Sequence, residues 1–128
     1  MKYGYQRTVS LSFDDVDNRI RASLKAIGFG VITEINVKDT MKEKLNKSFK
    51  KFKILGACNP PVAFEALSIE NEIGLLLPCN VTIWENEDGS TTVSAIDAKK
   101  MLSITGLDTV EHLAAQVNDL LKKSVDAV

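Results

Sequence analysis

Two cysteines, each followed by an asparagine, are the residues best suited to chemistry. They lie in the stretches 56–60 (GACNP) and 78–81 (PCNV). A deprotonated thiol can serve as a nucleophile, a redox centre or a soft metal ligand, and the N-terminus of a helix favours deprotonation. Cys58 comes directly before a predicted helix that opens with Pro60, which makes this cysteine a candidate reactive thiol. Cys79 is the second candidate.

A structural role is the alternative reading for both thiols, and the pattern favours it. Cys58 shares a predicted strand face with Phe52 and Ile54, and Cys79 shares one with Val81. Free cysteine is often a small buried hydrophobe. Two isolated cysteines without a CxxC spacing are also a weak metal signal. Cys58 and Cys79 are therefore weak metal candidates, and no cofactor is predicted.

Four polar residues complete the set of candidates. Asn59 either caps the helix that follows it or lines a site. Asn80 interrupts an apolar strand, so its amide either bonds to nearby backbone or lines a polar pocket. Asp97 either caps the next turn or supplies an acid to the same site. His112, the only histidine, is expected to be exposed, which leaves little material for a catalytic pair and favours a binding protein over an enzyme.

Charge is unevenly distributed along the chain. The lysine-rich segment, Lys38–Lys53, carries seven lysines and two acids, a local charge of +5. Residues 54–128 carry four lysines and eleven acids, a local charge of −7. The segment is able to dock an anionic partner, although a solvated surface is the simpler reading. The acidic remainder, and the absence of Walker, Rossmann and zinc-finger patterns, give no reason to expect nucleic-acid binding.

The elements that must position these residues follow from the spacing of apolar residues. Strands are predicted at 3–10, 31–37, 52–58, 75–87 and 91–96, and helices at 13–27, 40–47 and 60–73, with a last helix capped at Asp108. Ser12 and Asp39 are predicted N-caps, and a turn or short helix is expected around Met101. Asp88-Gly89 predicts a hairpin. This order fits an α+β sheet with helices on one face.

Length and composition fit one globular domain over residues 1–128. The chain is 45% hydrophobic and 26% charged, close to the average for globular proteins. No apolar run approaches the roughly 20 residues of a membrane helix. Residues 1–5 lack the apolar core of a signal peptide. We therefore expect a cytoplasmic protein whose cysteines are thiols.

Several of these stretches together resemble the bacterial and archaeal domain-of-unknown-function family 302. They are 54–60 (ILGACNP), 74–81 (GLLLPCNV), 95–97 (AID) and 101–102 (ML). The resemblance covers most of the chain and implies a fold similar to one half of the TATA-binding protein. That fold is β-α-β(4)-α, a curved antiparallel sheet backed by helices. The resemblance also implies a homodimer and implies no activity; Ala98 stands where the family often has proline.

These patterns predict a module that binds a small ligand or a partner in a polar pocket, and the resemblance implies that it is a homodimer. Cys58-Asn59 and Cys79-Asn80 would frame the pocket. The alternatives are redox, sulfur-handling or metal chemistry at the two cysteines, and docking of an anionic partner on the lysine-rich segment. The strand face that carries Trp84 is the predicted dimer surface or pocket wall, because tryptophan often anchors interfaces.

Overall fold

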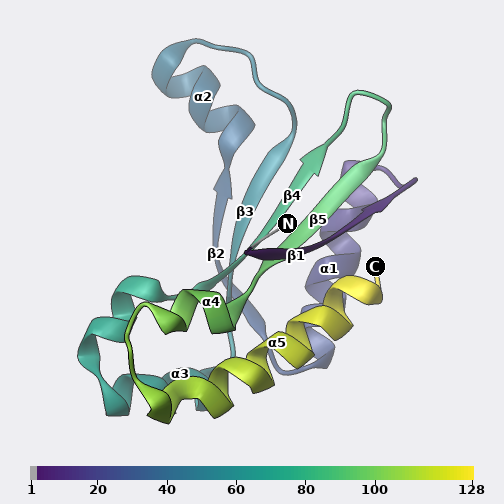
Figure 1. Ribbon diagram of the computed structural model, residues 1–128. Helices are drawn as coiled ribbons and strands as arrows, with labels where there is room; N and C mark the ends of the chain where they lie inside the picture. Colours follow the sequence, from purple (N-terminus) through teal and green to yellow (C-terminus); the bar gives the residue numbers. More distant parts are fainter. Residues whose placement is uncertain (1–2) are drawn as a thin grey trace.

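A five-stranded antiparallel sheet forms the centre of the computed structural model, which describes residues 3–128 (Figure 1). Its spatial order is β1-β5-β4-β3-β2. The strands are β1 (Gly4–Val9), β2 (Gly30–Asn36), β3 (Phe52–Cys58), β4 (Cys79–Glu85) and β5 (Thr91–Ile96). The helices are α1 (Phe13–Ala26), α2 (Val37–Leu45), α3 (Pro60–Ile69), α4 (Ala98–Ser103) and α5 (Glu111–Asp126), with 3-10 turns η1 (Asn71–Leu76) and η2 (Asp108–Val110). The predicted β-α-β(4)-α order with short extra helices is confirmed.

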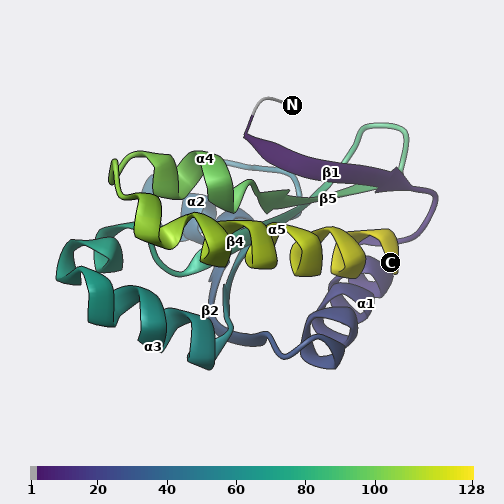
Figure 2. The same ribbon diagram turned by 60° about the horizontal axis from the view of Figure 1, so that its bottom comes forward.

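Helices α1 and α5 pack against one face of the sheet, and α5 lies across it (Figure 2). The apolar stripe of α1 is fully buried at Val16, Ile20 and Leu24. The sheet meets it with residues such as Val81 and Ile83, whose side chains are also fully buried. No helix in the described part of the chain is long and apolar enough to cross a bilayer.

The opposite face of the sheet, here called the open face, carries a mixture of aromatic, aliphatic and polar residues. Phe52 pairs with Trp84 across β3 and β4, and their rings stack at 5.7 Å between centroids. The prediction that Phe52 and Ile54 lie on the core side of β3 was wrong. Leu55 is the fully buried neighbour instead. Both sides of β3 are apolar, so alternation alone could not identify the covered face.

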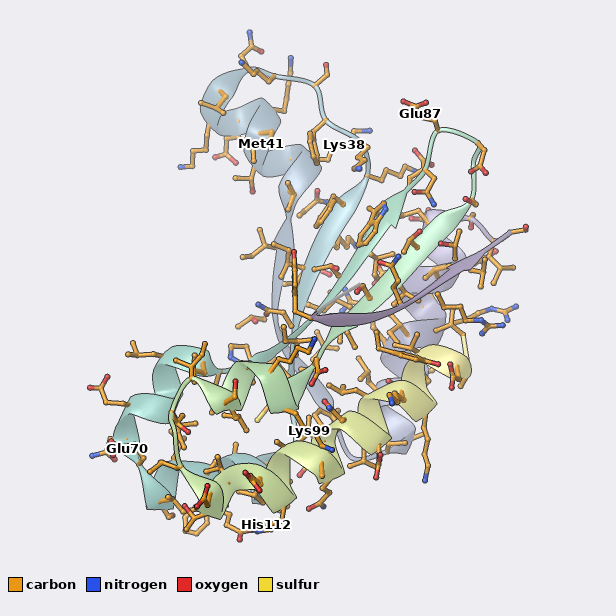
Figure 3. The ribbon with its side chains drawn as sticks, in the orientation of Figure 1. Lys38, Met41, Glu70, Glu87, Lys99 and His112 are labelled. Atoms are coloured by element: carbon orange, nitrogen blue, oxygen red, sulfur yellow. The ribbon has the colours of Figure 1, made fainter. Side chains whose placement is uncertain are left out.

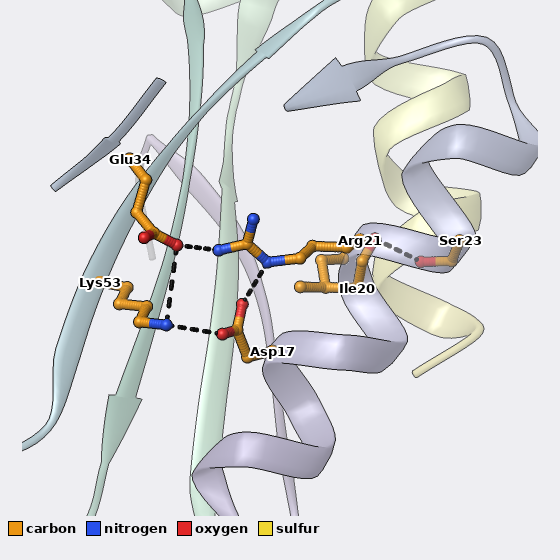
Figure 4. A network of polar contacts seen from close by, with 6 residues as sticks. All are labelled: Asp17, Ile20, Arg21, Ser23, Glu34 and Lys53. Atoms are coloured by element: carbon orange, nitrogen blue, oxygen red, sulfur yellow. Dashed lines mark hydrogen bonds and ion pairs between the residues drawn. The ribbon is translucent and has the colours of Figure 1, made fainter. Parts of the chain in front are cut away.

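Lys53 lies on the helix-covered face of β3, two residues from Leu55, and its ammonium group joins a network of charges there (Figure 4). Asp17 on α1 accepts from Lys53 at 2.8 Å and from Arg21 at 2.7 Å. Arg21 also pairs with Glu34 on β2. Burial by itself would raise the pKa of Asp17, but the hydrogen bonds from Lys53 and Arg21 outweigh burial and hold that pKa below its ordinary value. The network joins α1 to the β2–β3 edge.

Local capping explains where several elements begin. Ser12 caps α1 as predicted, accepting from the backbone N–H of Asp15 at 3.1 Å. The second helix begins at Val37, earlier than predicted, because Asn36 caps it by accepting from the N–H of Asp39 at 3.1 Å. Two acceptors three residues apart can each cap a helix, and the nearer one to the strand does so.

Three other boundaries differ from the prediction. Helix α3 ends at Ile69, and the segment containing Gly74 forms η1. Strand β4 begins at Cys79 and not at residue 75, because residues 71–76 are wound into η1. The cap predicted at Asp108 for the last helix does not form: Asp108 starts η2, and α5 begins at Glu111 without a side-chain cap.

Candidate functional site

A cavity of about 360 Å³ lies at the end of the sheet where β3 stops and β4 starts. We call it the sheet-end cavity. Figure 2 shows α3, α4 and the start of α5 gathered at this end of the sheet. The lining comes from all of these elements and includes Cys58, Asn59, Ala63, Ala66, Leu77, Cys79, Met101, Leu113 and Val117. Nearly all of the lining surface is apolar.

The sheet register brings the two cysteines to the same end of the sheet. Ala57 lies directly opposite Cys79 in the β3–β4 pair, so Cys58 is one residue beyond that pairing. Because neighbouring strands run in opposite directions, the end of β3, the start of β4 and the end of β5 lie at the same end of the sheet. The chain leaves β5 at Ile96 and enters α4 at Ala98, which places α4 beside the start of β4.

The two thiols differ in their surroundings. Cys79 is buried and only 7% exposed, whereas Cys58 is half-buried at the last position of β3. Burial, and then the proximity of Cys58, raise the pKa of the Cys79 thiol to about 11. Cys79 is therefore protonated at neutral pH. A buried protonated thiol is a poor nucleophile.

Asn59 caps α3 and does not project its amide oxygen to a ligand. Its Oδ1 accepts from the N–H of Val62 at 3.3 Å. Pro60 and Pro61 have no N–H, and Ala63 donates to the Asn59 carbonyl at 3.0 Å. The first turn of α3 therefore has no backbone donor left over for an anionic ligand.

The other two predicted site residues lie outside the cavity lining. Asn80 is exposed on the open face, opposite Gly56 in the β3–β4 register. Asp97 caps α4, and its Oδ1 accepts from Asn118 Nδ2 at 2.9 Å and from the N–H of Lys99 at 3.0 Å. Burial would raise the pKa of Asp97, but the Asn118 amide and the helix N–H groups hold it below its ordinary value.

The structure thus brings Cys58, Asn59 and Cys79 together and leaves Asn80 and Asp97 apart from them. The pocket differs from the predicted polar one because the Asn59 amide turns to a helix start and Asn80 faces the other side of the sheet. Sequence reasoning did not identify Met101 as a lining residue. Its place on α4 was the only available signal, since a methionine in a short helix beside a strand end is usually packed inward.

The family model described as "Domain of unknown function DUF302" matches residues 5–128. The chain belongs to the DUF302 family. The crystal structure of an uncharacterized conserved DUF302 protein from Bacillus stearothermophilus is similar, with a TM-score of 0.91 and 24% sequence identity. The match covers 99% of this chain and 98% of that chain, and it establishes the fold. No curated protein matches the sequence.

In this DUF302 protein the lysine-rich segment forms α2, the loop after it and the start of β3. Helix α2 projects beyond the sheet, and Lys38 and Met41 mark it in Figure 3. Lys53 is withdrawn from this surface by its pairing with Asp17 and Glu34. His112 lies at the opposite end of the molecule, on α5, where it is exposed as predicted and pairs with Glu65 of α3 at 3.2 Å.

Proposed function

We propose that this DUF302 protein is a binding module for a small, mainly apolar molecule that occupies the sheet-end cavity. The observation that carries the proposal is the cavity itself, about 360 Å³ in volume and apolar over nearly all of its lining. Sites for small ligands typically measure about 300–1,000 Å³ and are lined mostly by apolar side chains. The size and chemistry of this cavity both support a compact apolar ligand.

The mouth of the cavity supports the same reading. Ile32 on β2 and Leu67 on α3 both line the cavity, and they are 62% and 38% exposed. Apolar side chains that lead from solvent into an apolar cavity favour entry of an apolar molecule. The capped, proline-containing start of α3 disfavours phosphate or carboxylate ligands, because it offers them no free N–H.

A neutral fluorescent probe, N-phenyl-1-naphthylamine, tests the proposal. Ala63→Phe would place an aromatic ring in the cavity from its half-buried wall. We expect saturable binding to the wild type and a loss of about tenfold or more in affinity for this variant, equal to about 1.4 kcal/mol. Ala22→Phe, on the exposed side of α1, is the matched control and should bind as the wild type does.

Native mass spectrometry of freshly purified protein supplies an independent readout. A retained small molecule that is lost from the Ala63→Phe variant supports the proposal. Equal probe affinity for the wild type and for Ala63→Phe, together with no retained molecule, would overturn it.

The proposal includes a homodimer joined through the open faces. Ile35 on edge strand β2 is 50% exposed and lies on this face beside Ile54 and the Phe52–Trp84 stack. The basic helix α2 and the acidic hairpin that carries Glu87 flank the same end of the sheet (Figure 3). In a dimer with two-fold symmetry, the basic helix α2 of one copy would face the acidic hairpin of the other copy.

The cellular setting that fits is a reducing compartment such as the cytoplasm, where both cysteines remain thiols. The lysine-rich segment is the alternative contact surface, for an anionic protein partner. Nucleic-acid binding is not part of the proposal, and neither is a catalytic activity.

A further inference from the structure

Three sulfur-bearing side chains line the sheet-end cavity: Cys58, Cys79 and Met101. The whole chain has two cysteines and three methionines. Met41 lies on α2 at the far end of the molecule (Figure 3), and Met1 is outside the described residues. Most of the sulfur in this protein is therefore concentrated at one cavity.

The three sulfur side chains come from neighbouring positions of the fold. Cys58 ends β3, Cys79 begins β4, and Met101 lies one helical turn after Ala98, where α4 starts beside β4. Cys58 and Cys79 line the same cavity and lie one residue apart in the register of the β3–β4 pair. Methionine has three flexible torsions and a polarizable thioether, so its sulfur can turn toward the two thiols.

The donor set is soft and lacks oxygen and nitrogen ligands. Among residues 3–128 no group of three or more His, Cys, Asp or Glu side chains could hold a metal ion. Zn²⁺ almost always takes four ligands in a structural site, from cysteine, histidine or carboxylate. Thiolate and thioether ligands suit Cu(I), zinc and iron–sulfur clusters, and three sulfurs are fewer than the four ligands that zinc and iron–sulfur clusters usually take. A buried, apolar cavity with three sulfurs therefore suits a monovalent soft ion better than a divalent one.

We propose that Cys58 Sγ, Cys79 Sγ and Met101 Sδ form a binding site for one Cu(I) ion on the wall of the sheet-end cavity. The site goes beyond the proposed ligand function and does not require an apolar ligand to be present. No redox step is involved, because the ion enters and remains as Cu(I).

Each thiol that coordinates the ion exchanges its proton for a Cu–S bond. With both cysteines as thiolates and Met101 neutral, the complex carries one negative charge. Because ligation displaces protons, the apparent affinity rises with pH.

Anaerobic titration of the protein with Cu(I) against the chelator bathocuproine disulfonate tests the site. We expect one Cu(I) per chain and an ultraviolet sulfur-to-copper absorption. Cys58→Ser and Cys79→Ser should each weaken binding by at least about 10- to 100-fold, the loss typical of disturbed metal sites. Met101→Leu, which keeps the apolar volume, should weaken binding less. Met41→Leu is the matched control and should leave affinity unchanged.

Two outcomes overturn the proposal: wild-type affinity in the Cys58→Ser/Cys79→Ser double variant, or equal affinities of Met101→Leu and Met41→Leu. Circular dichroism checks that each variant folds. If the serine variants do not fold, X-ray absorption of the copper-loaded wild type decides, because three sulfur neighbours are expected and any nitrogen or oxygen neighbour contradicts them. The naphthylamine assay is run without copper, so failure of the copper site and failure of the ligand site remain distinguishable.

Discussion

Cys79 shows how position changes the chemistry of a single residue. From sequence alone, the neighbours of a cysteine are the only guide to whether its thiol is reactive or structural. Here the deciding factor is that β4 starts underneath α4 and α5, so that only 7% of Cys79 is exposed. The raised pKa keeps the Cys79 thiol neutral at ordinary pH.

The raised pKa of Cys79 predicts a loss of stability in alkali. The folded-state pKa of about 11 exceeds the ordinary cysteine pKa of 9.0, so the contribution of this thiol to stability is complete below about pH 9 and is lost as pH rises towards 11. A difference of about two pKa units corresponds to about 2–3 kcal/mol. The free energy of unfolding in urea should therefore fall more steeply between pH 8 and 11 for the wild type than for Cys79→Ser. Parallel profiles would contradict the assignment.

Asp17 predicts the opposite pH dependence. Its lowered pKa means that its contribution to stability is present above about pH 4, the range of an ordinary aspartate, and is lost as pH falls through the lower folded-state value. Asp17→Asn should destabilise the protein by about 1–3 kcal/mol at pH 7, because Lys53 and Arg21 lose their carboxylate partner. The exposed Asp119→Asn is the control. Equal effects of the two substitutions, or a difference that persists at pH 2, would count against the network.

At the scale of elements, the sequence predicted best where the signals are local. Helix α1 was located correctly because one cap, Ser12, and one apolar stripe agree with each other. Helix α3 was predicted too long because Ile69 and Ile73 continue its apolar spacing. The helix nevertheless stops, since Glu70 is extended and its own carboxylate accepts from the N–H of Glu72 at 3.1 Å. A side chain that caps the next turn competes with helix continuation.

The close packing of β2, β3 and the start of β4 around Gly56 leaves no room for a side chain at this position. A Cβ atom at this position would lie 2.0 Å from Thr33 Oγ1 and 2.7 Å from Pro78 Cγ. Gly56→Ala should therefore destabilise the protein by about 1–3 kcal/mol, as overpacked sites do. Thr33→Ala in the same chain should restore part of the loss. Gly30→Ala has open space around it and serves as the control in thermal unfolding.

For the whole molecule, the prediction of the fold was more complete than that of the site. The order of strands and helices along the chain follows from periodicity and from turn residues such as Gly89, which sits at φ 86° in the predicted hairpin. The sheet-end cavity is assembled from residues as distant as Phe29 and Val117. No spacing rule relates such residues, and the polarity of a cavity depends on which way each side chain turns. The sequence therefore identified Asn59 and Asn80 as polar candidates but could not show which way their side chains point.

The proposed dimer is tested at the same scale. Ile35→Glu places a charge on the open face, where burial against a second copy would leave it unpaired. We expect the dimerisation constant to weaken by at least about tenfold, or about 1.4 kcal/mol, in sedimentation equilibrium. Ile104→Glu changes a residue that is 75% exposed at the other end of the molecule and should leave the association unchanged. A monomeric wild type, or equal effects of both variants, would exclude this interface.

The weak packing of helix α3 makes it a segment that is expected to open locally. It is apolar on exposed and buried sides alike, with Phe64 at 76% exposure, and it packs chiefly against η1, with an exposed Glu65–His112 pair to α5. Segments with few buried contacts open locally at low free energy. Backbone amides at 64–69 should therefore exchange with deuterium sooner than those of Leu55 or Val81. An occupied cavity should slow the exchange of α3 selectively, so that protection of this one helix reports when the protein is loaded.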